Sequence, residues 1–366
     1  MIDTMGVILT SHNDSGFGEI TRMRSVAAIP FAGRYRLIDF VLSSMVNSGI
    51  INVGVATEYN FQSLMDHLGS GKPWGLARKK YGLTFLPPFA KSSANDGDEH
   101  MKSLYSILHY IKRSQQKYII VADCNNVCNL HFEAIVAEHK ESGADLTVVY
   151  QKQPVAKHGT YIAVDGDKVQ SIVASKDCVG ESNRLVGYYV FTKDLLINTL
   201  ERFQLLGKKY FIGDLINTYI EKHDVRGYCF EGYLATIEDI NDYYNVSMQL
   251  MDSSVRKSLF IGENRILTKV MDRVPTKYLG KASVKNSMIA DGCVINGKVE
   301  NSILFRGVVV EEGAVIKDSI VMQNSVISAN VRIGACIIDK DCIIRKDKEL
   351  VGQPNFPIVV GKHRTI

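Results

Sequence analysis

The sequence predicts an α/β domain with a mostly parallel sheet, followed by a β-helix built from six-residue repeats. Two observations carry this prediction. Strand-like and helix-like patterns alternate over the first two-thirds of the chain, and a six-residue apolar period replaces them from about Ala282. With 366 residues the chain is long enough for two domains.

Short apolar runs mark the buried strands of the first domain, and segments with apolar residues at helical spacing lie between them. The strand runs are 6–9, 51–56, 118–122 and 145–150. The helical segments are 61–68, 101–115 and 132–139. Buried strands that alternate with helices are typical of βαβ units and a mostly parallel sheet.

Two further elements complete this domain. Residues 161–173 indicate a hairpin, because Asp165-Gly166-Asp167 offers turn residues between two strand-like runs. A helical pattern over 238–251 closes the domain. We therefore place the first domain at residues 1–252 and a linker at 253–281.

The last quarter of the chain, residues 282–366, repeats with a period of six. Val310, Ile316 and Met322 form one series, which continues at Ile327 after a slip of one residue. Aliphatic residues at this spacing, with small or polar residues between them, are typical of a hexapeptide β-helix in which each repeat forms one flat side. A β-sandwich with coincidental spacing is the alternative.

The composition excludes several classes of protein. Hydrophobic residues make up 46% and charged residues 22% of the chain, and the net charge is only +4. A nucleic-acid partner is therefore not expected, and neither is a membrane, since no apolar run approaches about 20 residues. The acidic start Met1-Ile2-Asp3 argues against a signal peptide. Seven scattered cysteines indicate reduced thiols in a cytoplasmic protein.

Several motifs resemble those of one enzyme family. The most specific runs from Ala28 to Ile50 and includes Arg36-Leu37-Ile38-Asp39-Phe40; Gly71-Lys72-Pro73-Trp74 and Phe85-Leu86-Pro87-Pro88-Phe89 add to it. Together with the six-residue period, they resemble glucose-1-phosphate adenylyltransferase (ADP-glucose pyrophosphorylase). The resemblance implies a Rossmann-like nucleotidyltransferase domain and a left-handed hexapeptide β-helix. It also implies a reaction of ATP with glucose 1-phosphate that gives ADP-glucose and pyrophosphate.

The loop after the first strand departs from the family pattern. Active members carry Gly-Gly-x-Gly-x-Arg-Leu, whose backbone N–H groups cradle phosphates. Without gaps, the three glycines fall on Ser11, His12 and Asp14, and the arginine falls on Gly16. The lysine of the family's Lys-Pro pair falls on Val26. This degenerate nucleotide loop is similar to that of GlgD-type regulatory subunits of bacterial heteromeric enzymes.

The family's magnesium carboxylates are only partly retained. Asp123 follows the strand 118–122 and resembles the first of them, although a strand-end carboxylate also serves as a turn cap. The second falls on Thr236, where Glu238 is a candidate substitute that would share a strand face with it. One carboxylate is a poor site for a hard cation, so we expect Mg²⁺ binding to be weak or lost.

The sugar-phosphate pocket is equally degenerate. Lys176 resembles a family lysine that grips the sugar phosphate, and Asp214 matches an aspartate near the sugar, whereas the family's serine falls on Leu185. Lys176 and Asp214 are therefore catalytic remnants. An ordinary solvated lysine is the alternative for Lys176.

Two cations match positions that bind effectors in the family. Arg34 lies in a basic cluster, where arginine suits phosphate recognition, and Lys362 lies in a basic tail. The resemblance implies a sugar-phosphate effector at these positions. A solvated basic surface or a subunit interface is the alternative.

These expectations favour a regulatory, catalytically impaired subunit that assembles with a catalytic glucose-1-phosphate adenylyltransferase subunit in a heterotetramer and tunes its response. Whether the chain itself still binds ATP or glucose 1-phosphate stays open. One alternative is an active nucleotidyltransferase with a rearranged site that uses Asp123, Glu238 and Lys176. A stand-alone sensor of sugar phosphates or nucleotides is another.

Overall fold

The computed structural model describes residues 2–10, 14–57, 60–87, 99–155, 159–178, 180–206 and 209–366. The chain forms two compact units, both assembled from separate stretches of sequence. The first unit comprises Met1–His12, Phe40–Phe61 and Leu68–Leu234. The second comprises Asn13–Asp39, Gln62–His67 and Ala235–Ile366.

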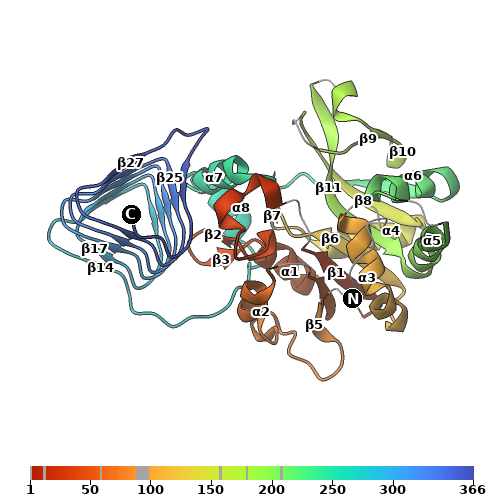
Figure 1. Cartoon of the computed structure of the whole chain (residues 1–366). Helices are drawn as coiled ribbons and strands as arrows, with labels where there is room; N and C mark the ends of the chain where they lie inside the picture. Colours follow the sequence, from red (N-terminus) through yellow and green to blue (C-terminus); the bar gives the residue numbers. More distant parts are fainter. Residues whose placement is uncertain are drawn as a thin grey trace. The chain divides into compact units, whose positions relative to one another are not determined.

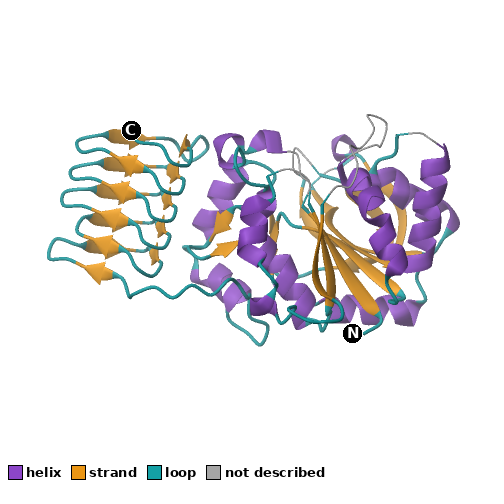
Figure 2. Cartoon of the chain, turned by 60° about the horizontal axis from the view of Figure 1, so that its bottom comes forward, coloured by secondary structure: helices purple, strands orange, loops and turns teal. Residues whose placement is uncertain are grey.

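The first unit is built around a nine-stranded sheet with the order β5-β4-β1-β6-β11-β8-β12-β10-β9 (Figures 1 and 2). Its strands are β1 (Thr4–Leu9), β4 (Asn52–Ala56), β5 (Gly82–Leu86), β6 (Tyr118–Asp123), β8 (Leu146–Pro154), β9 (Tyr161–Asp165), β10 (Lys168–Val173), β11 (Glu181–Thr192) and β12 (Val225–Cys229). The short strand β7 (Asn126–Cys128) follows β6. The predicted strands are thereby confirmed.

Helices cover both faces of this sheet, which explains its fully buried strands. On one face, α3 (Glu99–Arg113), α5 (Lys193–Leu206) and α6 (Ile212–Lys222) share a core with Met5, Val7 and Leu9 of β1. On the opposite face lies α1 (Ile38–Asn47), where Gly6 leaves room for Met45: a Cβ at Gly6 would lie 2.5 Å from its sulfur. The α4 helix (Phe132–Ser142) packs against β8 and β11.

The pairing of β11 adds a feature that the periodicity did not indicate. Strands β5, β4, β1 and β6 are parallel, as the alternating pattern predicts. Strand β11 runs antiparallel to both β6 and β8, so the sheet is mixed beyond β6. The hairpin of β9 and β10 is confirmed, with Gly166 at φ +61° in its turn.

The second unit contains a left-handed β-helix, which Figure 1 shows nearly end-on with three flat sides. Each side is a parallel five-stranded sheet. The first side holds β14 (Lys277–Tyr278), β17 (Val294–Ile295), β20 (Val309–Val310), β23 (Val326–Ile327) and β26 (Ile343–Ile344). The second holds β15 (Ser283–Lys285), β18 (Lys298–Glu300), β21 (Val315–Lys317), β24 (Arg332–Gly334) and β27 (Glu349–Val351). The third holds β16 (Met288–Ile289), β19 (Ile303–Leu304), β22 (Ile320–Val321), β25 (Cys336–Ile338) and β28 (Ile358–Val360).

The six-residue period corresponds to one side of this coil, and the slip has a structural cause. Val310 of β20 pairs with Ile327 of β23, so this turn takes 17 residues. One of its three sides is therefore a residue short. Many corners with positive φ carry asparagine or aspartate, and some of these stack between turns: Asn330 Nδ2 donates to Asp347 Oδ1 at 3.1 Å. Asparagine and aspartate tolerate this left-handed backbone better than other side chains.

Segments from distant parts of the sequence complete the second unit. They include the hairpin β2 (Pro30–Phe31) and β3 (Tyr35–Arg36), helix α7 (Ile240–Gln249) and helix α8 (Ser253–Phe260). Helix α2 (Gln62–Leu68) and strand β13 (Leu234–Thr236) are shared between the two units. The segment 253–281, expected as a linker, contains α8, and the coil already begins with β14, ahead of residue 282.

The N-terminal segment of the second unit is attached to its remaining elements by buried polar contacts. The Tyr243 hydroxyl donates to the Pro30 carbonyl at 2.8 Å, and Arg24 forms an ion pair with Asp339 at 2.9 Å. Among the helices that the structure describes, none combines the length and apolar character that crossing a membrane requires.

Candidate functional site

Asp123 ends β6 and directs its carboxylate to two neighbours within the first unit. Its Oδ1 lies 3.0 Å from Nε2 of His100, near the start of α3. Its Oδ2 lies against Gly187 of β11, where an added Cβ would be only 2.1 Å away. Gly187 has φ +80° at an irregular point in the β11 ladder, and the bare backbone there leaves room for the carboxylate.

This arrangement does not suit a magnesium ion. Mg²⁺ prefers an octahedral set of oxygen ligands, whereas one oxygen of Asp123 contacts an imidazole and the other packs against backbone. The described residues also contain no group of three His, Cys, Asp or Glu side chains able to hold a metal. The expectation that Mg²⁺ binds weakly or not at all stays a prediction, to which the His100 contact adds a physical reason.

The degenerate nucleotide loop is described only in part. Ser11 and His12 lie outside the described residues. Gly16, at the position of the family arginine, ends the short 3-10 helix Asp14–Gly16. A Cβ at Gly16 would lie 3.0 Å from Cβ of Asp239 and 3.1 Å from the carbonyl oxygen of Glu238. An arginine therefore cannot return to this position without a local shift.

The two catalytic remnants occupy ordinary structural positions. Lys176 is exposed in a 3-10 turn, Ser175–Asp177. Asp214 lies in the first turn of α6, where its Oδ2 accepts the backbone N–H of Phe211 at 2.7 Å. The carboxylate thus caps a helix end. Leu185, at the position of the family's serine, is buried in β11.

The candidate substitute for the second carboxylate does not share a strand face with Thr236, and that part of the prediction is wrong. Strand β13 ends at Thr236, and Glu238 lies in the turn that leads into α7. Its backbone N–H donates to Asp242 Oδ2 at 3.0 Å. The turn forms because Asp239 caps α7 and accepts the N–H of Asp242 at 2.8 Å. The alternation of a strand therefore no longer applies at Glu238.

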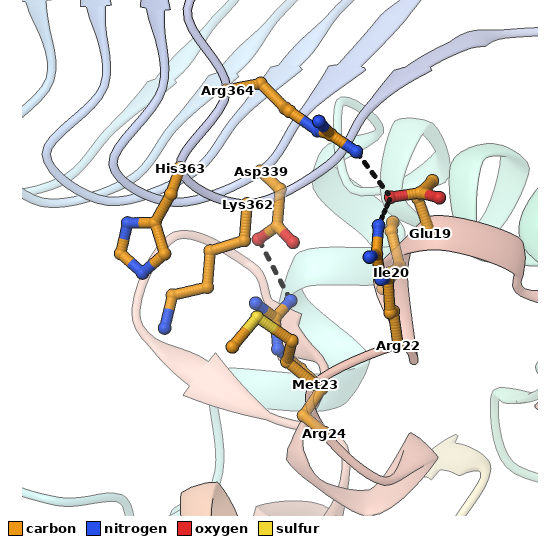
Figure 3. A pocket seen from close by; sticks show the side chains of 9 residues that line it. All are labelled: Glu19, Ile20, Arg22, Met23, Arg24, Asp339, Lys362, His363 and Arg364. Carbon is orange, nitrogen blue, oxygen red and sulfur yellow. Dashed lines mark hydrogen bonds and ion pairs between the residues drawn. The ribbon is translucent and has the colours of Figure 1, made fainter.

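Lys362 lines a cavity of about 380 Å³ in the second unit, which we call the Arg24 cavity (Figure 3). Most of its cations face acids. Arg24 pairs with Asp339 at 2.9 Å, and Glu19 faces Arg22 at 3.4 Å and Arg364 at 3.9 Å. Lys362 has no carboxylate partner among the described residues. The residues that line this cavity are Glu19, Ile20, Arg22, Met23, Arg24, Asp339, Lys362, His363 and Arg364.

Arg34 lines a different cavity of the same unit, of about 250 Å³, which we call the Arg306 cavity. Six of the described residues that line it are lysine or arginine, and one is an aspartate, Asp66. The structure therefore does not bring the two predicted effector cations, Arg34 and Lys362, into one cavity. The lining residues are Arg34, Tyr35, Arg36, Asp66, His67, Lys269, Met271, Arg273, Arg306, Gln323, Asn324 and Lys340.

Comparisons with known proteins agree with this architecture. The profile of the family described as "Nucleotidyl transferase" matches residues 6–253, and that of "GlmU-like, C-terminal hexapeptide" matches residues 274–355. The chain belongs to the nucleotidyl transferase family. Within this family it is similar to GlgD proteins and to glucose-1-phosphate adenylyltransferases.

Two relatives of this nucleotidyl transferase family member are called "Glycogen biosynthesis protein GlgD". That of Bacillus subtilis is 37% identical over 310 residues, which are 84% of this chain and 80% of the relative. That of Geobacillus stearothermophilus is 38% identical, with the same coverage. A "Glucose-1-phosphate adenylyltransferase" of Clostridium perfringens is 29% identical over 84% of this chain and 81% of its own length.

Several residues of this family member were not predicted from the sequence. His100 follows no motif, and Arg306 and Lys340 lie in the coil, where a cation normally indicates a solvated side. A third cavity, of about 840 Å³, lies in the first unit against α3 and β5. Tyr81, Phe85, Tyr110 and Arg113 are among its lining residues, and none of the predicted site residues that the structure describes lines it.

Proposed function

We propose that this chain is a regulatory, catalytically impaired subunit of a glucose-1-phosphate adenylyltransferase that acts in glycogen biosynthesis in the cytoplasm. Its catalytic partner joins ATP to glucose 1-phosphate and releases ADP-glucose and pyrophosphate. The pathway is supported by the names of the GlgD relatives, which are 37% and 38% identical. The reaction is supported by the adenylyltransferases, which align over 84% of this chain.

The observation that carries the impairment is the state of Asp123. Its Oδ1 lies within hydrogen-bond distance of His100 and its Oδ2 packs close to Gly187, and we expect this arrangement to compete with binding of a metal–nucleotide complex. The phosphate loop adds to this, since Ser11 and His12 replace glycines that would bring backbone N–H groups to phosphate. A lost transition-state contact of this kind costs about 2–3 kcal/mol, and two or three of them would slow turnover by several decades.

The regulatory role is supported by the cationic cavities of the second unit. The Arg306 cavity, with Arg34 and five further cations, suits a sugar-phosphate effector. The Arg24 cavity offers Lys362, whose neighbouring cations largely face acids. A coupling free energy of about 1–3 kcal/mol between such a site and the partner's active site changes affinity by roughly 5- to 150-fold.

The test is pyrophosphate release from ATP and glucose 1-phosphate with Mg²⁺, for this chain alone, for a catalytic subunit from the same source alone, and for the mixture. We expect no turnover from this chain alone. In the mixture we expect a rate or an effector response that the catalytic subunit alone does not show. Turnover by this chain alone at ordinary enzymatic rates would overturn the proposal.

An Asp123→Asn variant of this chain is the matched control in the mixture. In a regulatory subunit, the variant leaves unchanged the extra rate or effector response of the mixture, because Asp123 does not act on substrate. If this extra rate or response disappears with Asp123→Asn while the complex still forms, this chain contributes catalysis. That outcome favours the active nucleotidyltransferase with a rearranged site.

A further inference from the structure

The third cavity, which we call the Tyr110 cavity, lies in the first unit between α3 and β5, an edge strand of the sheet. Its volume of about 840 Å³ is in the range of cavities that hold small organic ligands. Both elements supply apolar lining: Phe85 and Leu86 come from β5, and Ile107 and Tyr110 come from α3. This cavity is therefore large and apolar enough to enclose a small molecule.

The Tyr110 ring is fixed in the wall of this cavity. Gly54 of β4 provides the room for it, because a Cβ at Gly54 would lie 2.7 Å from Cε1 of Tyr110. The phenol donates to Oδ1 of Asn52 at 2.9 Å, and the Asn52 amide in turn donates to Gln116 Oε1 at 3.1 Å. Burial raises the pKa of Tyr110 to about 12, so the phenol keeps its proton at neutral pH. The cavity thus has an aromatic wall whose polar end is already bonded to the protein.

Tyr81, directly before β5, supplies a second fixed ring. Its hydroxyl donates to Oε1 of Gln115 at 3.1 Å, which ties it to the residues that follow α3. Nζ of Lys80 lies 5.1 Å from the centroid of the Tyr81 ring, so a cation lies beside this aromatic wall. The half-buried Phe85 adds a third ring. Because aromatic rings favour stacked and edge-to-face contacts, this lining favours an occupant with a flat ring.

The hydroxyl groups of this cavity already donate to the protein. Ser106 Oγ donates to the carbonyl oxygen of Ser103 at 2.7 Å, and Ser114 Oγ donates to that of Ile111 at 2.7 Å. Both phenols also donate to carboxamide oxygens, as described above. A sugar carries many hydroxyl donors that need acceptors, and the described lining offers no carboxylate to accept them. The polar groups therefore do not favour a carbohydrate.

The charged side chains that line this cavity in the described part of the chain are Lys80 and Arg113, and no aspartate or glutamate accompanies them. Within the same described part, neither cation forms an ion pair with a carboxylate. The next residue along α3 differs: Lys112 points to Glu201 of α5 and forms an ion pair with it. The two cations at the cavity are therefore available to a negatively charged group of a ligand.

We propose that the Tyr110 cavity binds an aromatic carboxylate, with its ring against the aromatic wall and its carboxylate at Arg113 and Lys80. The fixed rings recognise the flat apolar part, and the two cations recognise the charge. Arginine suits this role because its planar group matches a carboxylate. The proposal goes beyond the proposed function, since it concerns the first unit of this chain alone and involves neither the catalytic partner nor its substrates.

The experiment is calorimetric titration of the full chain with sodium cinnamate at pH 7.5, in the presence of excess sodium sulfate. Sulfate is an anion without a ring, so it competes at sites that recognise charge alone. We expect cinnamate to bind with a dissociation constant of about 1 mM or lower. Cinnamyl alcohol lacks the charge and cyclohexanepropionate lacks the flat ring, so each should bind at least about threefold more weakly. Absence of saturable cinnamate binding, or equal binding of the three compounds, would overturn the proposal.

Three variants locate the ligand. Arg113→Gln should weaken cinnamate binding about 3- to 10-fold and leave the binding of cinnamyl alcohol unchanged. Lys112→Gln is the matched control on the same helix and should bind cinnamate as wild type does. Ser106→Phe should fill the cavity and abolish binding, with circular dichroism as the check that the variant folds. Equal effects of Arg113→Gln and Lys112→Gln, or cinnamate binding that persists in folded Ser106→Phe, contradict the assignment. Failure of these titrations leaves the pyrophosphate-release experiment unaffected.

Discussion

Replacing Arg24 with methionine should destabilise the second unit far more than the small change in side-chain volume suggests. The Arg24–Asp339 pair joins atoms 2.9 Å apart, and its side chains are 3% and 1% exposed. Methionine fills a similar volume but leaves the Asp339 carboxylate buried without its cation, and Oδ2 of Asp339 already has no partner. Removing one member of such a pair costs about 3–5 kcal/mol. For a unit of this size, that lowers the melting temperature by roughly 6–20 °C.

The measurement is thermal unfolding of wild type and variant, followed by circular dichroism. The same cavity provides the matched control, because Arg22 faces Glu19 at 3.4 Å with side chains that are 64% and 47% exposed. An exposed pair contributes about 0–1 kcal/mol, so Arg22→Met should change the melting temperature by a few degrees at most. Equal effects of the two substitutions would refute the argument that burial decides the cost.

Three further predictions concern single residues. Burial lowers the pKa of His139 to about 4, so the first unit should lose about 3 kcal/mol of stability as pH falls from 6.5 to 4, and urea titrations of His139→Leu should show a flatter profile. Gly187→Ala should lower the free energy of unfolding, measured by urea titration, by about 1–3 kcal/mol, because the added Cβ would collide with the Asp123 carboxylate. Gly166→Ala, which is also at positive φ but in open space, should lower it less in the same titration. Asn330→Ala should lower the melting temperature by a few degrees, because alanine tolerates the left-handed backbone of this corner less well than asparagine. An unchanged melting temperature would contradict this. Asn330→Gly should have a smaller effect, because glycine tolerates that backbone.

The sequence was enough to predict those structural features that depend on a local pattern of residues. The coil followed from aliphatic residues six apart, because each side of the coil repeats the same inward position, and even the one-residue slip proved to be a short side. Asp123 was found at the end of β6 because a buried strand precedes it. These inferences need only neighbouring residues.

Contacts that depend on long-range folding could not be predicted. No periodicity indicates that His100 reaches Asp123, because the two lie on different elements, α3 and β6, that only the folded sheet brings together. The Arg306 cavity combines cations from the N-terminal third, the segment before the coil and the coil itself. Each is an ordinary surface cation in the sequence, and their shared burial appears only in the folded unit.

The second unit is assembled from stretches that are far apart in the sequence, and this has a consequence for its folding during synthesis on the ribosome. Arg24 and Asp339 are 315 residues apart, so at about 5–20 residues per second the arginine emerges roughly 15 s to 1 min before its carboxylate exists. Each turn of the coil can add to the preceding one as it emerges. Arg24, by contrast, lacks its buried carboxylate until nearly the whole chain has been made. Over that interval the basic segment around it is open to chaperones, and the last turns of the coil decide when the ion pair can form.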